Sequence, residues 1–179
     1  MAPDDFAPLL RAGKKRPLWT AGGATHAVDY RRPDIERLLP HRDPFLFVDQ
    51  ITSIDIEQAT IAGKRRIDPA DPVFAGHFPG APIYPGVLLL ETMGQLGICL
   101  SHFIRQSSHE ISPGASPADV RALKIHNAIF LAEVCPRDEL TILGKLVHDD
   151  DATAICAGQI MKGETIAAFA VMEVYFVES

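Results

Sequence analysis

Apolar residues fill nearly every position from Gly86 to about Arg105, where the sequence reads GVLLLETMGQLGICLSHFIR. As an α-helix, this stretch of about 20 residues would be roughly 30 Å long. A helix that is apolar all round needs protein on every side. Glu91, Thr92 and Gln95 interrupt the stretch, so it falls short of the ~18 uninterrupted apolar residues that indicate a membrane span. We therefore predict a long core helix and no membrane segment.

Segments rich in β-branched and aromatic residues lie on both sides of this helix and predict strands. Two precede it, over Pro44–Ile56 and Gln58–Ile67, and their closeness predicts a hairpin. Four follow it, over Arg121–Leu131, Glu139–Asp149, Ala152–Lys162 and Glu164–Glu178. Short turns containing Asp or Gly join the last three, which makes them antiparallel neighbours. This order predicts an α+β fold in which a curved antiparallel sheet wraps around one long central helix.

Residues 1–30 show no sustained hydrophobic period and mix Pro, Gly and Ala with the basic run Lys14–Arg16. We predict an N-terminal extension over residues 1–30 and a single domain over residues 31–179. The alternative is a segment that packs on a partner subunit or docks an acidic carrier through its basic run. Pro33–Pro40 predicts a short helical turn that could act as a lid. The N-terminus lacks the apolar core of a secretory signal, so we expect a cytoplasmic protein.

The composition is that of a soluble globular domain, with 179 residues of which 47% are hydrophobic and 22% charged. A net charge of -6 argues against a general nucleic-acid binder, because neutralising phosphates requires a basic face. Cys99, Cys135 and Cys156 lie far apart, without the spacing of a zinc site. We interpret them as small buried residues in a reducing compartment, and we expect no metal.

Three features around the start of the helix could carry acid–base chemistry. His77 lies on a proline-rich loop, and an imidazole suits proton transfer near neutral pH. Pro85–Gly86 opens the helix, where free backbone amides favour negative charge that develops on an oxygen. Glu91 lies among apolar residues, and burial there would favour the protonated, proton-donating carboxyl. Gln95 follows Glu91 at i+4 and can orient it.

Each feature also has a structural interpretation when it is taken alone. His77 could be a loop histidine held by backbone hydrogen bonds, and Glu91 could be a core carboxylate paired with a cation or a backbone group. We interpret His41–Arg42 as structural hydrogen bonding beneath the site. Together, however, an acid and a base beside an oxyanion donor can remove a proton α to a carbonyl and expel a β-hydroxyl. The combination predicts a dehydratase.

Two stretches carry a resemblance to a known family: LLPHRDPFLFVDQI (Leu38–Ile51) and FAGHFPGAPIYPGVLLLETMGQ (Phe74–Gln95). They resemble the signature stretches of the (3R)-3-hydroxyacyl-acyl-carrier-protein dehydratases of the FabZ type. The similarity extends over about Pro33–Val177 in order and strand pattern, but it is tight only in these two stretches. The resemblance implies dehydration of carrier-bound 3-hydroxyacyl thioesters to trans-2-enoyl thioesters. It also implies simple dehydration without double-bond migration, because relatives that also isomerise carry Asp in place of Glu91.

The same resemblance implies a hot-dog fold and a homodimer whose paired sheets run continuously, with a trimer of dimers left open as a larger assembly. Its partner would be an acyl carrier protein that presents the acyl chain on 4'-phosphopantetheine, and no cofactor is implied. His77 of one subunit would face Glu91 of the other, with His77 as the base and Glu91 as the acid or the holder of a water molecule.

The residues expected to bind substrate follow from the same two stretches. The Gly86 N–H would donate to the thioester carbonyl, and Phe78 and Pro79 would shape the mouth of the acyl tunnel. Gln95 completes this set.

Some positions depart from the pattern of that family. Asp43 stands where an aromatic residue is usual, Arg137 replaces a glycine, and the loop Gln106–Val120 is long. These departures affect carrier docking and chain length, so the parent pathway stays open between fatty-acid elongation and polyketide or polyene synthesis. Two other functions also stay open. One is a hot-dog thioesterase in which Glu91 activates water, and the other is a non-catalytic acyl-binding subunit.

Overall fold

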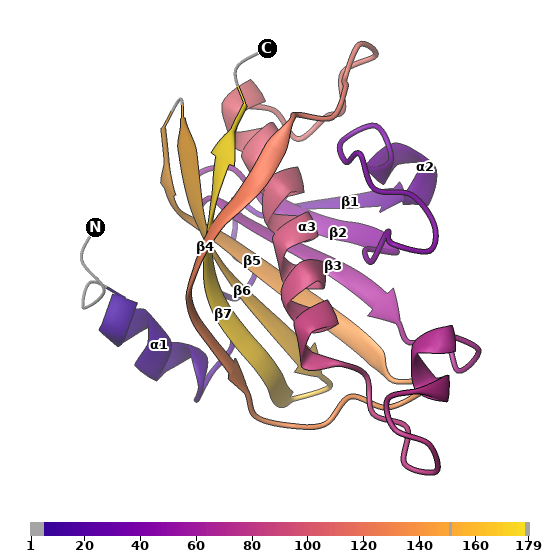
Figure 1. Cartoon of the computed structure of the whole chain (residues 1–179). Coiled ribbons are helices and arrows are strands. Elements are labelled where there is room, and N and C mark those ends of the chain that lie inside the picture. Colours follow the sequence, from indigo (N-terminus) through magenta and orange to yellow (C-terminus); the bar gives the residue numbers. More distant parts are fainter. Residues whose placement is uncertain (1–5, 151, 178–179) are drawn as a thin grey trace.

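The computed structural model describes residues 6–150 and 152–177. In this part of the chain, a seven-stranded antiparallel sheet curves around the long helix α3 (Gly86–Gln106) (Figure 1). The strand order across the sheet is β1-β2-β3-β5-β6-β7-β4. The strands are β1 (His26–Arg31), β2 (Gln50–Asp55), β3 (Thr60–Arg66), β4 (Val120–Phe130), β5 (Glu139–Asp149), β6 (Thr153–Lys162) and β7 (Thr165–Phe176). The short helices are α1 (Ala7–Gly13), α2 (Arg32–Ile35) and the 3-10 helix η2 (Pro72–Ala75).

The predicted α+β architecture is confirmed, and it is the hot-dog arrangement that the resemblance implied. β2 and β3 form the expected hairpin, and β5, β6 and β7 are antiparallel neighbours in that order. Two details differ. β2 begins only at Gln50, so the segment from Pro44 is not part of the strand. β4 pairs with β7 and forms an edge of the sheet. The expected end of the last strand, Glu178, lies outside the described residues.

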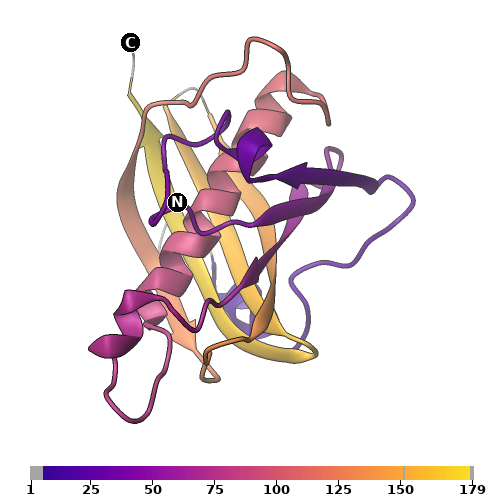
Figure 2. The ribbon, with the colours of Figure 1, turned by 90° about the vertical axis from the view of Figure 1, so that its right-hand side faces the viewer.

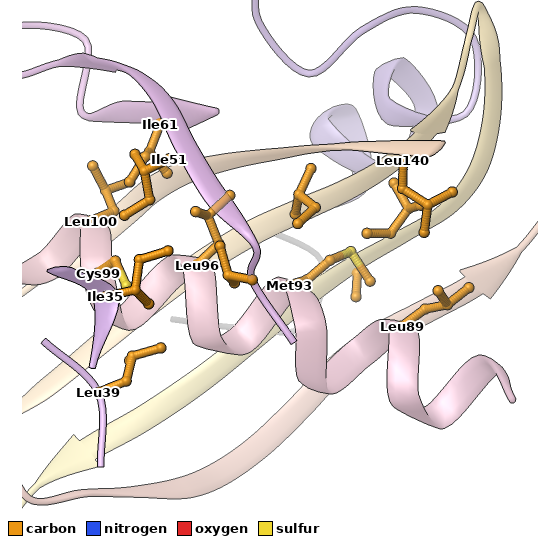
Figure 3. Packing of buried hydrophobic residues seen from close by; sticks show 14 of the residues in the cluster. Ile35, Leu39, Ile51, Ile61, Leu89, Met93, Leu96, Cys99, Leu100 and Leu140 are labelled. Carbon is orange, nitrogen blue, oxygen red and sulfur yellow. The ribbon is translucent and has the colours of Figure 1, made fainter. Parts of the chain in front are cut away.

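The buried face of α3 follows helical spacing, which is why this sequence forms the core helix. Leu89, Met93, Leu96, Leu100 and Phe103 are at most 2% exposed. Figure 3 shows the first four together with Cys99, opposite side chains from the sheet such as Ile51, Ile61 and Leu140. Each such side chain stabilises the fold by about 1.5–3 kcal/mol when it is removed from water.

The length and composition of α3 would suffice for a membrane span, but more than half of its apolar stretch is buried inside the protein. Packing against the sheet therefore accounts for its apolar character. The approach between helix and sheet is close, because a Cβ placed on Gly158 of β6 would lie 2.6 Å from the Met93 Cβ. Glycine is required at this contact.

The segment before β1 covers the face of the sheet opposite α3 (Figures 1 and 2). Phe6, Leu9, Leu10 and Leu18 pack on Ile155, Ala157, Phe169 and Val171. Gln159, which is fully buried, fastens the segment, since its Oε1 accepts from the Leu18 N–H at 2.7 Å and its Nε2 donates to the Gly13 carbonyl at 2.7 Å. Residues 1–5 of the expected extension lie outside the described residues. The division of the chain at residue 30 stays a prediction, although β1 already belongs to the sheet from His26.

Candidate active site

His77 follows η2, and the hydrogen bonds of that turn fix its backbone. Asp71 accepts from the Val73 N–H at 2.9 Å, and the His77 N–H donates to the Val73 carbonyl at 2.9 Å. The imidazole Nδ1 lies 2.9 Å from the Ile83 carbonyl oxygen. A carbonyl can only accept, so we assign the proton of the neutral ring to Nδ1, which leaves the lone pair on Nε2. The backbone hydrogen bond expected of a purely structural loop histidine is therefore present, and the same bond leaves the Nε2 of His77 able to accept a proton.

His77 lines a cavity of about 450 Å³ beside the start of α3, together with Tyr84, Gly86, Leu131 and Val134. The Leu88 N–H donates to the Pro85 carbonyl at 3.0 Å, whereas the N–H groups of Gly86 and Val87 have no acceptor within the helix and can donate to a ligand. This cavity therefore combines an imidazole with unused N–H donors.

Gly86 opens α3 directly after Pro85, and the ring of Phe130 lies against it. A Cβ on Gly86 would lie 2.8 Å from the Phe130 Cε1 atom, which is closer than such atoms approach. Glycine is therefore needed here for a packing reason that the sequence did not reveal. Phe130 stands at the end of β4, and its side chain is 49% exposed in the single chain.

Gln95 holds Glu91, as the i+4 spacing predicted. Its Nε2 donates to the Glu91 Oε1 at 2.9 Å and to the Phe45 carbonyl at 2.8 Å. Its Oε1 accepts from the Phe47 N–H at 2.7 Å. Gln95 is fully buried, and both of its N–H donors are engaged. Its amide donors serve to position Glu91, and none is left over for a substrate.

The surroundings of Glu91 differ from those we expected. We predicted an apolar environment that favours the protonated carboxyl, but the side chain is 35% exposed in the single chain and accepts from Gln95. The His41 Nε2 also lies 3.3 Å from the Glu91 Oε1. The reason is that Glu91 borders an open cavity of about 340 Å³ between α3 and the edge strand β4.

Glu91 and His77 line different cavities within one chain, and Val87 borders both of them. Phe78 and Pro79 lie on the exposed loop that follows His77. The Phe78 ring stacks on the His77 ring with centroids 4.0 Å apart, and its side chain is 52% exposed. The structure thus brings Phe78 to His77 and Gln95 to Glu91, but it does not join these two groups within one subunit.

Arg65 lines neither of these cavities but connects residues behind them, and the sequence analysis missed this link. Its Nη2 donates to the Tyr84 hydroxyl at 2.6 Å, and its guanidinium carbon lies 4.3 Å from the centre of the Phe47 ring. Burial lowers the pKa of Arg65 from its ordinary value. The side chain links the loop of His77, through Tyr84, to the segment that anchors Gln95, through Phe47. Within the run Lys64–Arg66 nothing marks Arg65 as the buried member.

The departures from the family pattern have structural counterparts. Asp43 lies 3.3 Å from Arg32 in an exposed ion pair. Arg137 has a φ of +73°, in the left-handed region that favours glycine.

Cys99 and Cys156 are buried, as expected, whereas Cys135 is half-buried. Among the described residues, no three His, Cys, Asp or Glu side chains are grouped closely enough to hold a metal ion.

The sequence model of the FabA-like domain matches residues 39–170, a range that contains every site residue described above. The chain therefore belongs to the FabA-like family. Within that family it is of the FabZ type, the 3-hydroxyacyl-acyl-carrier-protein dehydratases, as its two signature stretches predicted.

Curated relatives carry this name at moderate identity. The FabZ dehydratase of Protochlamydia amoebophila is 35% identical over 144 residues, which cover 80% of this chain and 88% of the relative. That of Chlamydia trachomatis is 39% identical over 113 residues, covering 56% of this chain and 74% of the relative.

Solved structures agree on the fold. The dehydratase heterocomplex ApeI:P from Xenorhabdus doucetiae superimposes with a TM-score of 0.63 at 18% identity, covering 81% of this chain and 91% of that one. A hypothetical thioesterase from Streptococcus pneumoniae, solved with coenzyme A, gives a TM-score of 0.51 at 14% identity, covering 68% and 81%. At these identities the likeness concerns the fold alone.

Proposed function

We propose that this chain dehydrates 3-hydroxyacyl thioesters carried by an acyl carrier protein and forms trans-2-enoyl thioesters. The observation that carries the proposal is the hydrogen bond from His77 to the Ile83 carbonyl, because it leaves Nε2 as a proton acceptor beside the first amides of α3. The names of the curated relatives support the same reaction.

The reaction divides between three groups. His77 Nε2 removes a proton from the α-carbon, while the Gly86 N–H donates to the thioester oxygen on which negative charge develops. Electrons return to form the double bond between the α- and β-carbons as the bond from the β-carbon to its hydroxyl breaks. The departing hydroxyl takes a proton from the Glu91 carboxyl, or from a water molecule that Glu91 holds, and leaves as water. The chemistry uses no metal and no redox cofactor.

We propose that the site is completed in a homodimer. β4 pairs with β7 on one side only, so within the described residues its outer side is a free edge, and it carries Leu123 and Ile125, which are 54% and 55% exposed. An apolar edge of this length is a template for another strand. Val87, which is 68% exposed and borders both cavities, would be covered by the partner. Pairing through β4 would make the two sheets continuous and would place His77 of one subunit opposite Glu91 of the other. A trimer of dimers stays an open alternative.

The partner in this proposal is an acyl carrier protein whose phosphopantetheine arm delivers the acyl chain past Phe78 and Pro79. We further propose a soluble, cytoplasmic location, since the one described helix long enough to span a membrane forms the core of the fold.

Mass spectrometry of the purified protein with 3-hydroxyacyl carrier-protein thioesters of several chain lengths tests the proposal. Loss of one water with the thioester intact is the expected result. Release of free acid and free carrier thiol would instead indicate the thioesterase. Tight binding without any change in mass would indicate the acyl-binding subunit.

Two variants tie the reaction to the site. His77→Ala and Glu91→Gln should each lower dehydration at least about 100-fold while the assembly stays intact by gel filtration. Near-normal turnover in either variant would contradict the assignment of that residue.

A further inference from the structure

A second cavity lies beyond Glu91 along the same face of α3. Glu91, Gly94 and Ile98 line the cavity next to β4, and Ile98, His102 and Arg105 line the next one, of about 270 Å³. Their spacing of three or four residues places all five side-chain positions on one helical face. From Glu91 to His102 the helix rises about 16 Å. The two cavities therefore follow each other away from the proposed reaction centre, and both border Ile98.

The lining of these cavities becomes more polar with distance from Glu91. Leu90 and Ile98 of α3 and Met172 and Val174 of β7 give the first a mainly apolar lining, to which the charged residues Arg121, Lys124 and Glu173 also belong. The second is walled by part of the long loop that precedes β4, with Ser112 and Ser116 among its lining residues. A purely aliphatic chain end would gain nothing from such a wall, because the polar groups there would lose contact with water.

His102 lines this distal cavity, and one of its ring nitrogens lacks a hydrogen-bond partner among the described residues. Its Nε2 is buried, and within the described part of the chain it has no hydrogen-bond partner. Burial lowers the pKa of His102, so the ring stays neutral at pH 7 and offers either an N–H or a lone pair. Leaving such a buried atom without a partner is unfavourable.

Arg105 does not make the cavity a site for an anion. Its guanidinium donates to Asp149 and to the Asp150 carbonyl, and it lies 3.6 Å from the centre of the Phe176 ring. Because its charge is paired, the cavity offers neutral hydrogen-bonding partners.

We infer that the distal cavity at the C-terminal end of α3 is a subsite for a hydroxyl group at the far end of the acyl chain. This inference rests on the proposed function, because it assumes that the acyl chain lies along α3 from Glu91. The hydroxyl would exchange a hydrogen bond with the His102 imidazole, which turns its Nε2 toward the cavity when the ligand binds, while the chain fills the mainly apolar cavity before it. The substrate class would thus be long 3-hydroxyacyl thioesters whose distal end is polar.

Binding of unreactive ligands tests this subsite without requiring turnover. Two saturated acyl-pantetheine thioesters of about 14 carbons, a length suited to the span from Glu91 to His102, would differ only in a terminal methyl or hydroxyl group. Calorimetry on the wild-type protein should show about 3- to 10-fold tighter binding of the hydroxyl-ended ligand. Equal or tighter binding of the methyl-ended ligand would overturn the inference.

Substitution of His102 tests whether this residue causes the preference for the hydroxyl-ended ligand. His102→Leu should shift it toward the methyl-ended ligand, whereas His102→Gln, which keeps a hydrogen-bonding group, should retain it. An unchanged preference in His102→Leu would also overturn the inference. If His102→Leu fails to fold, Ile98→Phe replaces it. The larger side chain would narrow the passage between the two cavities, so it should weaken binding of both long ligands more than binding of a four-carbon thioester. Equal weakening for the short ligand would contradict a continuous path between the cavities.

Dehydration of a short 3-hydroxyacyl carrier-protein thioester is measured in parallel and reports on the proposed function alone. Absent dehydration together with a clear hydroxyl preference would reject the reaction and keep the subsite. Normal dehydration without that preference would keep the reaction and reject the subsite.

Discussion

The Gln95 amide holds the Glu91 carboxyl from one helical turn away, with 2.9 Å between Nε2 and Oε1. The same amide is fixed by the backbone of Phe45 and Phe47, so a segment distant in sequence sets the geometry of Glu91. His77 is held in a comparable way by the Ile83 carbonyl. A backbone carbonyl thus fixes His77 directly, whereas the backbone fixes Glu91 indirectly through the Gln95 side chain.

Gln95→Leu removes the partner of Glu91 without removing the carboxyl. We expect kcat to fall about 10- to 100-fold with a smaller change in KM, because Glu91 loses its orientation. The buried Phe47 N–H would also lose its acceptor, which should lower the free energy of unfolding by about 1–3 kcal/mol. Steady-state kinetics and urea unfolding measure the two effects.

Thr92→Val is the matched control for Gln95. Thr92 is equally buried on α3, and its hydroxyl donates to the Leu88 carbonyl at 2.7 Å and not to Glu91. The Thr92→Val variant should keep kcat within about threefold of the wild type. If Gln95→Leu behaves like this control, Gln95 has no positioning role.

Gly86→Ala tests the close contact at the start of α3. Its Cβ would meet the Phe130 ring at 2.8 Å, so either the helix start or the ring must move. We expect kcat/KM to fall at least about tenfold, since displacement of the Gly86 N–H weakens the oxyanion contact. Gly86→Ala combined with Phe130→Leu should recover part of this loss. A double variant no better than the single one would show that the ring is not the cause.

The sequence predicted the core helix and three of the six strand pairings, β2 with β3, β5 with β6 and β6 with β7, because hydrophobic period and turn chemistry are local signals. Local patterns could not predict that β4 pairs with β7, because long connections join β4 to the rest of the chain and a long connection does not determine which strand lies beside it. Gln95 was predicted as the partner of Glu91 from helical spacing alone. Arg65 and the contact between Gly86 and Phe130 join segments far apart in the chain, and no local pattern encodes them. The exposure of Glu91 was also missed, since it depends on the open edge at β4.

His102 makes the stability of the fold depend on pH in a defined direction. Burial lowers its pKa in the folded state, so the unfolded chain binds a proton more readily below about pH 6.5. The stability that the neutral ring contributes is present above that pH and is lost as the pH falls through the folded pKa. Urea unfolding at pH 7.5 and 5.5 should show a smaller acid loss in His102→Leu than in the wild type. Equal losses would mean that His102 titrates as it does in the unfolded chain.

Arg137 occupies a left-handed turn position before β5 at a conformational cost. Arg137→Gly should raise the free energy of unfolding by about 0.5–1 kcal/mol, because glycine adopts this φ without strain. Gly163, with a φ of +56° and nothing within 4 Å of its Cβ position, is the matched control, and Gly163→Ala should lower stability by a similar amount. A drop in stability for Arg137→Gly would show that contacts of the side chain outweigh the backbone strain.

The central claim is that His77 and Glu91 act together from opposite subunits, and subunit mixing tests it most directly. His77→Ala and Glu91→Gln chains would be unfolded together, refolded and assayed for enoyl thioester. If sites form between subunits, each mixed dimer has one intact site, so random pairing should restore about one quarter of wild-type activity. If the two residues act within one chain, the mixed dimers contain no intact site, and activity no higher than that of the separate variants would contradict the account.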